Sequence, residues 1–231
     1  MRVLVVTAVA AEAAAVTGAG ADTAPGPVLP GGYALTRTPA YDVLVGGVGP
    51  AAAAAATATA LAVADAAGEP YGLVVSAGIG GGFPPHAPVG SVVVSDSVVA
   101  ADLGAETPDG YLPVDALGFG RTVHPSPAGL SALLAEALGA VHAPVLTVST
   151  VTGSAARAAE LTARHPRAAA EAMEGFGVAE AAAAHGLPVV EIRAVSNAVG
   201  PRDRAAWRIG DAMAALRQAF HQLVPVLQEQ P

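Results

Sequence analysis

Short runs rich in valine alternate with alanine-rich segments along this chain, and this alternation restricts its fold more than any other feature. Continuous apolar runs, without alternating polar residues, are typical of strands that are buried on both faces. When such strands alternate with helices, the helices cover both faces of a largely parallel sheet. No linker, internal repeat or break in composition interrupts the pattern. The sequence therefore predicts one α/β domain over residues 1–231.

The expected elements follow from these patterns and from Gly and Pro positions. Strands are predicted at residues 2–6, 41–46, 73–76, 91–95, 145–151 and 189–195. Helices are predicted at residues 51–67, 128–138, 155–164, 170–185 and 209–227. Gly186 and Pro188 indicate the end of the helix at 170–185. Residues 102–127 are rich in Gly, Pro and Asp and are expected to form a long excursion from the sheet.

Charge and composition exclude several classes of protein. Eleven Lys and Arg against nineteen Asp and Glu give a net charge of −8, so we expect no nucleic-acid partner. Cysteine is missing and the six histidines show no metal-ligand spacing, so we expect no disulfide, no metal and no cofactor. Only 13% of residues are charged. Such a surface favours a buried subunit interface, and we expect a homodimer or a higher homo-oligomer.

Two apolar segments bear on where the protein resides. Residues 3–11 follow Arg2 and faintly resemble a signal peptide, but Glu12 interrupts the run and its β-branched residues favour a strand. Residues 51–64 are too few for a membrane span of about 20 residues. We therefore expect a cytoplasmic protein without a membrane partner.

The residues that follow each strand are the candidate site, because ligands of parallel α/β sheets bind beyond the carboxyl ends of strands. A Gly-Val-Gly-Pro-Ala-Ala run at residues 47–52 fits a dinucleotide fingerprint, but its acidic partner Glu69 is not at a strand end. Binding of a nicotinamide cofactor therefore stays a distant alternative. Residues 76–81 read Ser-Ala-Gly-Ile-Gly-Gly directly after a buried strand. Glycines there let backbone N–H groups approach a ligand closely.

Four polar side chains are predicted to lie in apolar surroundings. Glu171 and Glu174 are three residues apart on the helix expected at 170–185, so they would share one face. An unpaired buried carboxylate is costly, and a sugar diol would give Glu174 two hydroxyl donors. Arg193 ends an apolar strand and needs a carboxylate partner. Asn197 offers one acceptor and two donors to a flat heterocycle.

Taken in this order and spacing, these residues resemble the nucleoside phosphorylase/nucleosidase superfamily. The resemblance runs from about residue 2 to residue 220. It is carried by residues 6–12, 46–49, 76–81, 89–96, 173–174 (Met-Glu) and 193–197 (Arg-Ala-Val-Ser-Asn). It implies a three-layer α/β/α sandwich around a twisted mixed, mainly parallel sheet, usually dimeric or larger. It also implies cleavage of the N-glycosidic bond of a purine nucleoside, through a transition state with positive charge on the ribose.

The resemblance also implies roles for single residues. Glu12 matches the general base for the attacking water, and Asn197 matches the position that contacts the base. Met173 and Glu174 match the ribose-binding pair, with Glu174 accepting from the 2′- and 3′-hydroxyls. The wall beside the ribose and the purine edge are matched by Ser76, Ala77, Gly78 and Val151.

Two departures from the superfamily pattern narrow the expected activity. Its phosphorylases hold phosphate with arginines, one of them just before the Ser-Ala-Gly loop, where this chain has Val74 and Val75. Water is therefore the expected nucleophile. Asn197 replaces the aspartate of adenine-specific nucleosidases, and its amide suits a 6-oxopurine, since the NH₂ donates to O6 and the carbonyl accepts from a protonated N7. The resemblance thus favours futalosine, a hypoxanthine nucleoside of an alternative menaquinone route, which would be hydrolysed to hypoxanthine and dehypoxanthinyl futalosine.

Residues 200–208 follow Asn197 and hold three arginines and the only tryptophan. They form either a solvated loop or a site for the carboxylate-bearing tail of the substrate, with an aromatic wall and a cationic clamp. The candidate tail-binding residues are Arg202, Arg204, Trp207 and Arg208.

Three other activities stay open. The first is an adenine-releasing nucleosidase acting on methylthioadenosine, adenosylhomocysteine or aminodeoxyfutalosine. The second is a purine nucleoside phosphorylase, and the third is a nucleoside-binding protein without catalysis. The presence of both Glu12 and Glu174 argues against the third, because a binding protein needs no base for water.

Overall fold

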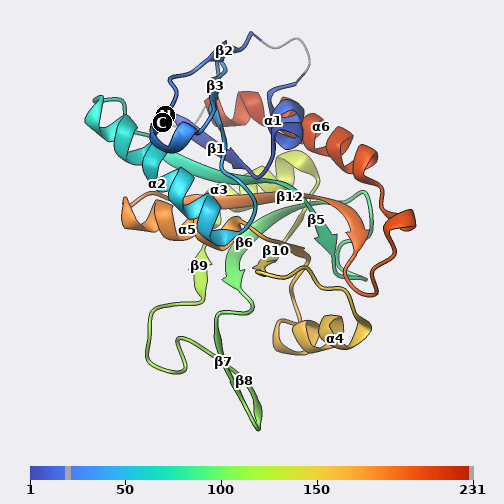
Figure 1. Cartoon of the computed structure of the whole chain (residues 1–231). Coiled ribbons are helices and arrows are strands. Elements are labelled where there is room, and N and C mark those ends of the chain that lie inside the picture. Colours follow the sequence, from blue (N-terminus) through green and yellow to red (C-terminus); the bar gives the residue numbers. More distant parts are fainter. Residues whose placement is uncertain (19–21, 229–231) are drawn as a thin grey trace.

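A mixed β-sheet forms the middle layer of the molecule in a computed structural model that describes residues 1–18 and 22–228 (Figure 1). Its strands are β1 (Val3–Thr7), β2 (Ala24–Pro25), β3 (Leu35–Arg37), β4 (Asp42–Val45), β5 (Leu73–Gly82), β6 (Val92–Ala100), β9 (Val123–Pro125), β10 (Val141–Thr147), β11 (Ala170–Ala172) and β12 (Val189–Ala198). The strand order is β11-β10-β6-β12-β5-β1-β4-β3-β2, and β9 pairs with β6. The central run β12-β5-β1-β4 is parallel. Its strands are apolar without alternation, as expected of parallel strands that are covered on both faces.

Helices form the two outer layers. They are α1 (Ala10–Thr17), α2 (Pro50–Ala66), α3 (Ala128–Leu138), α4 (Ala155–Arg164), α5 (Gly175–Ala184) and α6 (Ile209–Gln228). Helices α1, α3 and α6 pack on one face of the sheet. Helices α2 and α5 pack on the other face (Figure 1).

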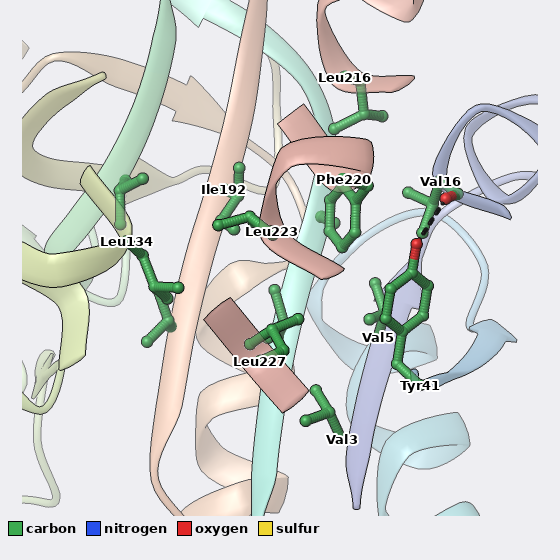
Figure 2. Close-up of a cluster of buried hydrophobic side chains, with 14 of the residues drawn as sticks. Val3, Val5, Val16, Tyr41, Leu134, Ile192, Leu216, Phe220, Leu223 and Leu227 are labelled. Atoms are coloured by element: carbon green, nitrogen blue, oxygen red, sulfur yellow. Dashed lines mark hydrogen bonds between the residues drawn. The ribbon is translucent and has the colours of Figure 1, made fainter. Parts of the chain in front are cut away.

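The core beneath α6 shows why this helix forms where it does. Leu216, Phe220, Leu223 and Leu227 recur at helical spacing and lie buried against the sheet (Figure 2). The Tyr41 hydroxyl donates to a backbone carbonyl at the end of α1, 2.9 Å away. The hydroxyl is therefore satisfied although it is buried.

Five strands close into a ring that sets the position of the site. β11 pairs in parallel with β10 and antiparallel with β5. The five strands β5, β12, β6, β10 and β11 are therefore paired side by side in a closed ring. Small apolar side chains such as Ala143, Ala170 and Val195 fill the ring. The closure brings β11 beside the carboxyl ends of β5 and β12.

The predicted three-layer α/β/α sandwich is confirmed. Helices α3 and α4 begin and end at the predicted residues. The excursion at 102–127 carries the hairpin of β7 (Gly104–Thr107) and β8 (Gly110–Pro113), which projects from the body (Figure 1). Residues 19–21 and 229–231 of the predicted domain lie outside the described residues.

Three predicted elements are wrong in ways that matter for the site. The helix expected at 170–185 is strand β11, a short connection and the shorter helix α5. The glycine-rich residues 77–82 continue strand β5 rather than leaving it. The strand expected at 145–151 is β10, which ends at Thr147. In the first two cases pairing with neighbouring strands overrides the local preference of the sequence.

Candidate active site

A cavity of about 230 Å³ lies at the carboxyl ends of β5, β11 and β12. Six of the predicted site residues line it, namely Glu12, Val151, Met173, Glu174, Asn197 and Trp207. A larger hollow of about 450 Å³ lies between α1, α6 and Tyr41, and its lining contains none of the predicted residues. The smaller cavity is therefore the candidate active site.

Glu12 lies in the first turn of α1, and three backbone N–H groups fix its carboxylate. Oε1 accepts from the N–H of Ile79 at 3.0 Å. Oε2 accepts from the N–H groups of Ala8 and Val9 at 3.0 and 3.3 Å. The side chain is buried yet lines the cavity. Its position is thus set by β1 and β5 together, before any ligand binds.

Glu174 connects β11 to α5 and is held from two sides. Oε1 accepts from the N–H of Gly49 at 3.2 Å. Oε2 accepts from the N–H of Met173 at 3.3 Å and lies 3.2 Å from Nη2 of Arg193. Gly49 has a φ of 91°, which favours glycine at this position. The Gly-Val-Gly-Pro turn therefore orients a carboxylate, a role unrelated to a dinucleotide.

Arg193 is fully buried on β12 and connects the carboxylates of the site. Its Nε donates to Oε1 of Glu191 at 2.8 Å, and its Nη2 donates to Oγ of Ser76 at 3.1 Å. Burial lowers the pKa of Arg193, but the nearby carboxylates of Glu191, Glu174 and Glu12 together raise it by more. The pKa of Arg193 therefore lies above the usual value. The guanidinium is therefore charged and balances the surrounding carboxylates.

Glu191 is a residue of the site that was not predicted. This side chain is fully buried, and its Oε2 has no hydrogen-bond partner among the described residues. Burial raises the pKa of Glu191, and Arg193 lowers it. Residues two apart on a strand point to the same face, so the spacing of Glu191 and Arg193 could have predicted their contact.

The residues predicted to form the ribose wall lie partly behind it. Ser76 and Ala77 are buried, and Ser76 contacts Arg193 rather than the cavity. A Cβ atom on Gly78 would lie 2.5 Å from both Nη1 of Arg193 and Oε1 of Glu12. Glycine is thus required there to let these two groups approach. The cavity wall itself is made by the next residues of β5, Ile79 to Gly81.

Glu171 also faces the cavity, although it does not share a helix with Glu174 as predicted. It lies on β11, where Oε1 accepts from the N–H of Thr152 at 2.8 Å and Oε2 accepts from the Thr152 hydroxyl. Burial raises the pKa of Glu171, and the two hydrogen bonds lower it. Val151, beside Thr152, lies in the loop after β10 and is partly exposed at the cavity.

Asn197 and Trp207 also line the cavity. Oδ1 of Asn197 accepts from the Ser196 hydroxyl at 2.8 Å, and its Nδ2 donates to the carbonyl of Ala198 at 3.1 Å. The guanidinium of Arg202 lies 5.0 Å from the centre of the Trp207 ring, and that of Arg204 lies 5.9 Å from it. Arg208 instead pairs with Asp211 at 2.7 Å on the surface of α6. The structure brings together only part of the predicted tail cluster.

The described residues, 1–18 and 22–228, contain no group of three or more acidic or histidine side chains that could hold a metal ion. No helix within these two ranges is both long and apolar enough to cross a membrane.

Known proteins similar to this chain show its family. The model of the phosphorylase superfamily matches residues 2–227, almost the whole chain. The chain belongs to the phosphorylase superfamily. Among curated members, a futalosine hydrolase of Streptomyces coelicolor is 64% identical over 230 residues, covering 99% of this chain and 97% of that protein. A futalosine hydrolase of Acidothermus cellulolyticus is 47% identical, covering 94% of this chain and 88% of its own.

Solved structures of the superfamily share the fold over nearly the whole chain. An S-adenosylhomocysteine nucleosidase of Streptococcus pyogenes superposes with a TM-score of 0.81 at 17% identity, covering 100% of this chain and 98% of its own. A futalosine hydrolase of Helicobacter pylori gives a TM-score of 0.80 at 16% identity, covering 98% of each chain. At such identities the likeness establishes the fold alone.

Proposed function

We propose that this member of the phosphorylase superfamily hydrolyses the N-glycosidic bond of futalosine, releasing hypoxanthine and dehypoxanthinyl futalosine. The observation that carries this proposal is the 64% identity to the Streptomyces coelicolor futalosine hydrolase across 99% of the chain. The site supports it, since Glu12, Glu174 and Asn197 line one cavity. The enzyme would then act in the futalosine route to menaquinone, in the cytoplasm.

The proposed reaction uses two carboxylates in different roles. Glu12 takes a proton from a water molecule whose oxygen attacks C1′ of the ribose. The bond from C1′ to N9 breaks and its electron pair passes to the base. N7 takes up a proton from solvent, so the base leaves as the neutral N7–H tautomer, and the proton on Glu12 returns to solvent. Glu174 accepts from the 2′- and 3′-hydroxyls beside Met173, where its charge stabilises the developing ribose cation. Asn197 donates to O6 of the base and accepts from N7–H.

The lining of the cavity supports water rather than phosphate as the nucleophile. It contains no lysine or arginine among the described residues. Arg193, behind the lining, already pairs with Glu191 and Glu174. A phosphate dianion would meet two carboxylates there, Glu12 and Glu174, and no unpaired cation.

Incubation with four nucleosides in phosphate-free buffer tests the proposal. We expect hypoxanthine to be released from futalosine at a higher kcat/KM than the bases of inosine, adenosine or methylthioadenosine. Added phosphate should leave the rate unchanged. A phosphate requirement would identify a phosphorylase, preferential release of adenine would identify an adenine nucleosidase, and binding without release of any base would identify a non-catalytic protein.

Replacing Asn197 by Asp is expected to shift base selection toward adenine. The amide donates to O6 of hypoxanthine, whereas an ionised carboxylate repels O6 and accepts from the 6-amino group of adenine. A mismatch that leaves a buried polar group unpaired costs about 1–3 kcal/mol, or about 5- to 150-fold in efficiency. The measurement is the ratio of kcat/KM for futalosine and aminodeoxyfutalosine. If Asn197→Asp leaves the ratio unchanged, Asn197 does not select the base.

The proposal extends to the tail of the substrate and to assembly. Trp207, with Arg202 and Arg204 against its ring, is proposed to bind the carboxylate-bearing tail. Arg208 is less suited, because its guanidinium already pairs with Asp211. We also propose that the chain forms one domain and assembles as a homodimer or higher homo-oligomer. Large apolar side chains are exposed around the projecting hairpin, where Phe119 is 67% exposed, and this supports a subunit interface.

A further inference from the structure

Glu171 is a carboxylate of the cavity wall that the proposed reaction does not use. It is almost fully buried on β11, and it still contributes to the lining. Thr152 supplies two donors to it. The two oxygens of a carboxylate offer about four lone-pair sites, so these bonds leave acceptor capacity toward the cavity.

The sheet places Glu171 opposite Asn197 across a glycine. Gly81 of β5 is paired with Glu171 of β11 on one side and with Asn197 of β12 on the other. Neighbouring strands lie about 4.8 Å apart, so the two flanking backbones are about 10 Å apart. A Cβ atom on Gly81 would lie 2.9 Å from Cγ2 of Val199 and 3.4 Å from Nδ2 of Asn197, so glycine keeps a side chain out of the space between Glu171 and Asn197. This arrangement suits a flat ring held at two edges.

The edge of a purine that carries N1 differs between the two candidate bases. N1 of hypoxanthine carries a hydrogen and donates, whereas N1 of adenine is an acceptor. A carboxylate is an acceptor only. It therefore pairs with N1–H of hypoxanthine and repels N1 of adenine.

We infer that Glu171 is a second base-selecting residue, which accepts a hydrogen bond from N1–H of a 6-oxopurine held between it and Asn197. The inference rests on the proposed function and adds a residue to its specificity. Thr152, in the loop after β10, orients the Glu171 carboxylate. The N–H of Thr152 donates to that carboxylate and is therefore not free to donate to N1 of adenine. Two side chains on opposite sides of Gly81 would then read the two edges of the base.

The charge of Glu171 depends on polar and charged groups from three other segments of the chain. Burial raises its pKa, the Thr152 N–H and hydroxyl and Arg157 of α4 lower it, and Asp102 after β6 raises it. Protonation would turn the acceptor into a donor. The preference for hypoxanthine should therefore weaken as the pH falls.

The test measures the affinities of free hypoxanthine and adenine by calorimetry, in wild type and in Glu171→Gln. A glutamine keeps the shape: its carbonyl accepts from the Thr152 N–H, and its NH₂ can donate both to the Thr152 hydroxyl oxygen and to N1 of adenine. We expect the ratio of hypoxanthine to adenine affinity to fall about 5- to 150-fold. The KM for futalosine should rise more than kcat falls, because the contact exists in both ground and transition states. Glu136→Gln, an exposed glutamate of α3, is the matched control and should leave the ratio unchanged.

A second measurement keeps the test valid if Glu171→Gln does not fold. Wild type should bind hypoxanthine more tightly than 1-methylhypoxanthine, which lacks the N1–H donor. Equal affinity for these two bases, or an unchanged hypoxanthine to adenine ratio in folded Glu171→Gln, would overturn the inference. These measurements need no turnover. A wild type that discriminates the bases but does not cleave futalosine would contradict the proposed function and leave the base contact supported.

Discussion

Glu12→Gln is expected to slow futalosine hydrolysis about 10²–10⁴-fold at saturating substrate, the usual loss when a general base is removed. Glutamine keeps the length of the side chain and one carbonyl oxygen for the N–H of Ile79. It has no basic oxygen to take the proton of the attacking water. Because the lost interaction belongs to the transition state, kcat should fall while KM changes little. Steady-state rates of hypoxanthine release measure this.

The control for Glu12→Gln is Glu136→Gln, an exposed glutamate on α3 that should turn over futalosine like wild type. Circular dichroism establishes that both variants fold. A folded Glu12→Gln enzyme with nearly normal kcat would remove Glu12 from the reaction and assign the activation of water elsewhere.

The layered fold could be predicted because its cause is local in the sequence. Apolar runs such as 189–195 carry no alternation, and this alone requires cover on both faces of the sheet. Helices α3 and α4 were placed at the right residues because turn residues flank them. Helix α4 also has a capping serine, Ser154, whose side chain accepts from the backbone of Arg157.

The errors arose where pairing between distant segments decides the structure. Residues 170–172 are alanine and glutamate, which favour a helix, but β10 and β5 on either side draw them into a strand. The glycines of β5 have little strand preference of their own, and β12 holds them in register. The local sequence pattern of β11 or β5 does not show which strands pair with it.

The candidate site could be predicted only in part, because pairing between distant segments also positions some of its residues. Glu12 and Glu174 follow strands, Asn197 lies near the carboxyl end of β12, and the sheet brings the three to one cavity. Glu191 lies inside a strand, and Glu171 was assigned to a helix that begins only at Gly175. Side chains that act through such pairing require the topology before their contacts can be inferred.

Arg193→Met is expected to destabilise the fold by about 3–5 kcal/mol, the cost of removing one partner of a buried ion pair. Among the described residues, Glu191 would lose the one hydrogen-bond partner of its side chain, and Glu174 would keep the backbone donors of Gly49 and Met173. Urea denaturation measures the free energy of unfolding. Arg208→Met is the control, because its ion pair with Asp211 is exposed and such pairs contribute about 0–1 kcal/mol.

The pH dependence and a double variant separate this charge effect from a loss of packing. Without Arg193 the pKa of Glu191 should rise further, because burial already raises it and Arg193 lowers it. A carboxyl group whose pKa is higher in the folded than in the unfolded state stabilises the fold at low pH, and this contribution is lost as the pH rises through the folded pKa. The deficit of Arg193→Met should therefore narrow as the pH falls. Adding Glu191→Met should recover part of the stability at neutral pH, since the uncompensated carboxylate is removed. If the deficit is independent of pH and the double variant is less stable than Arg193→Met, Arg193 stabilises the fold by packing and not by balancing charge.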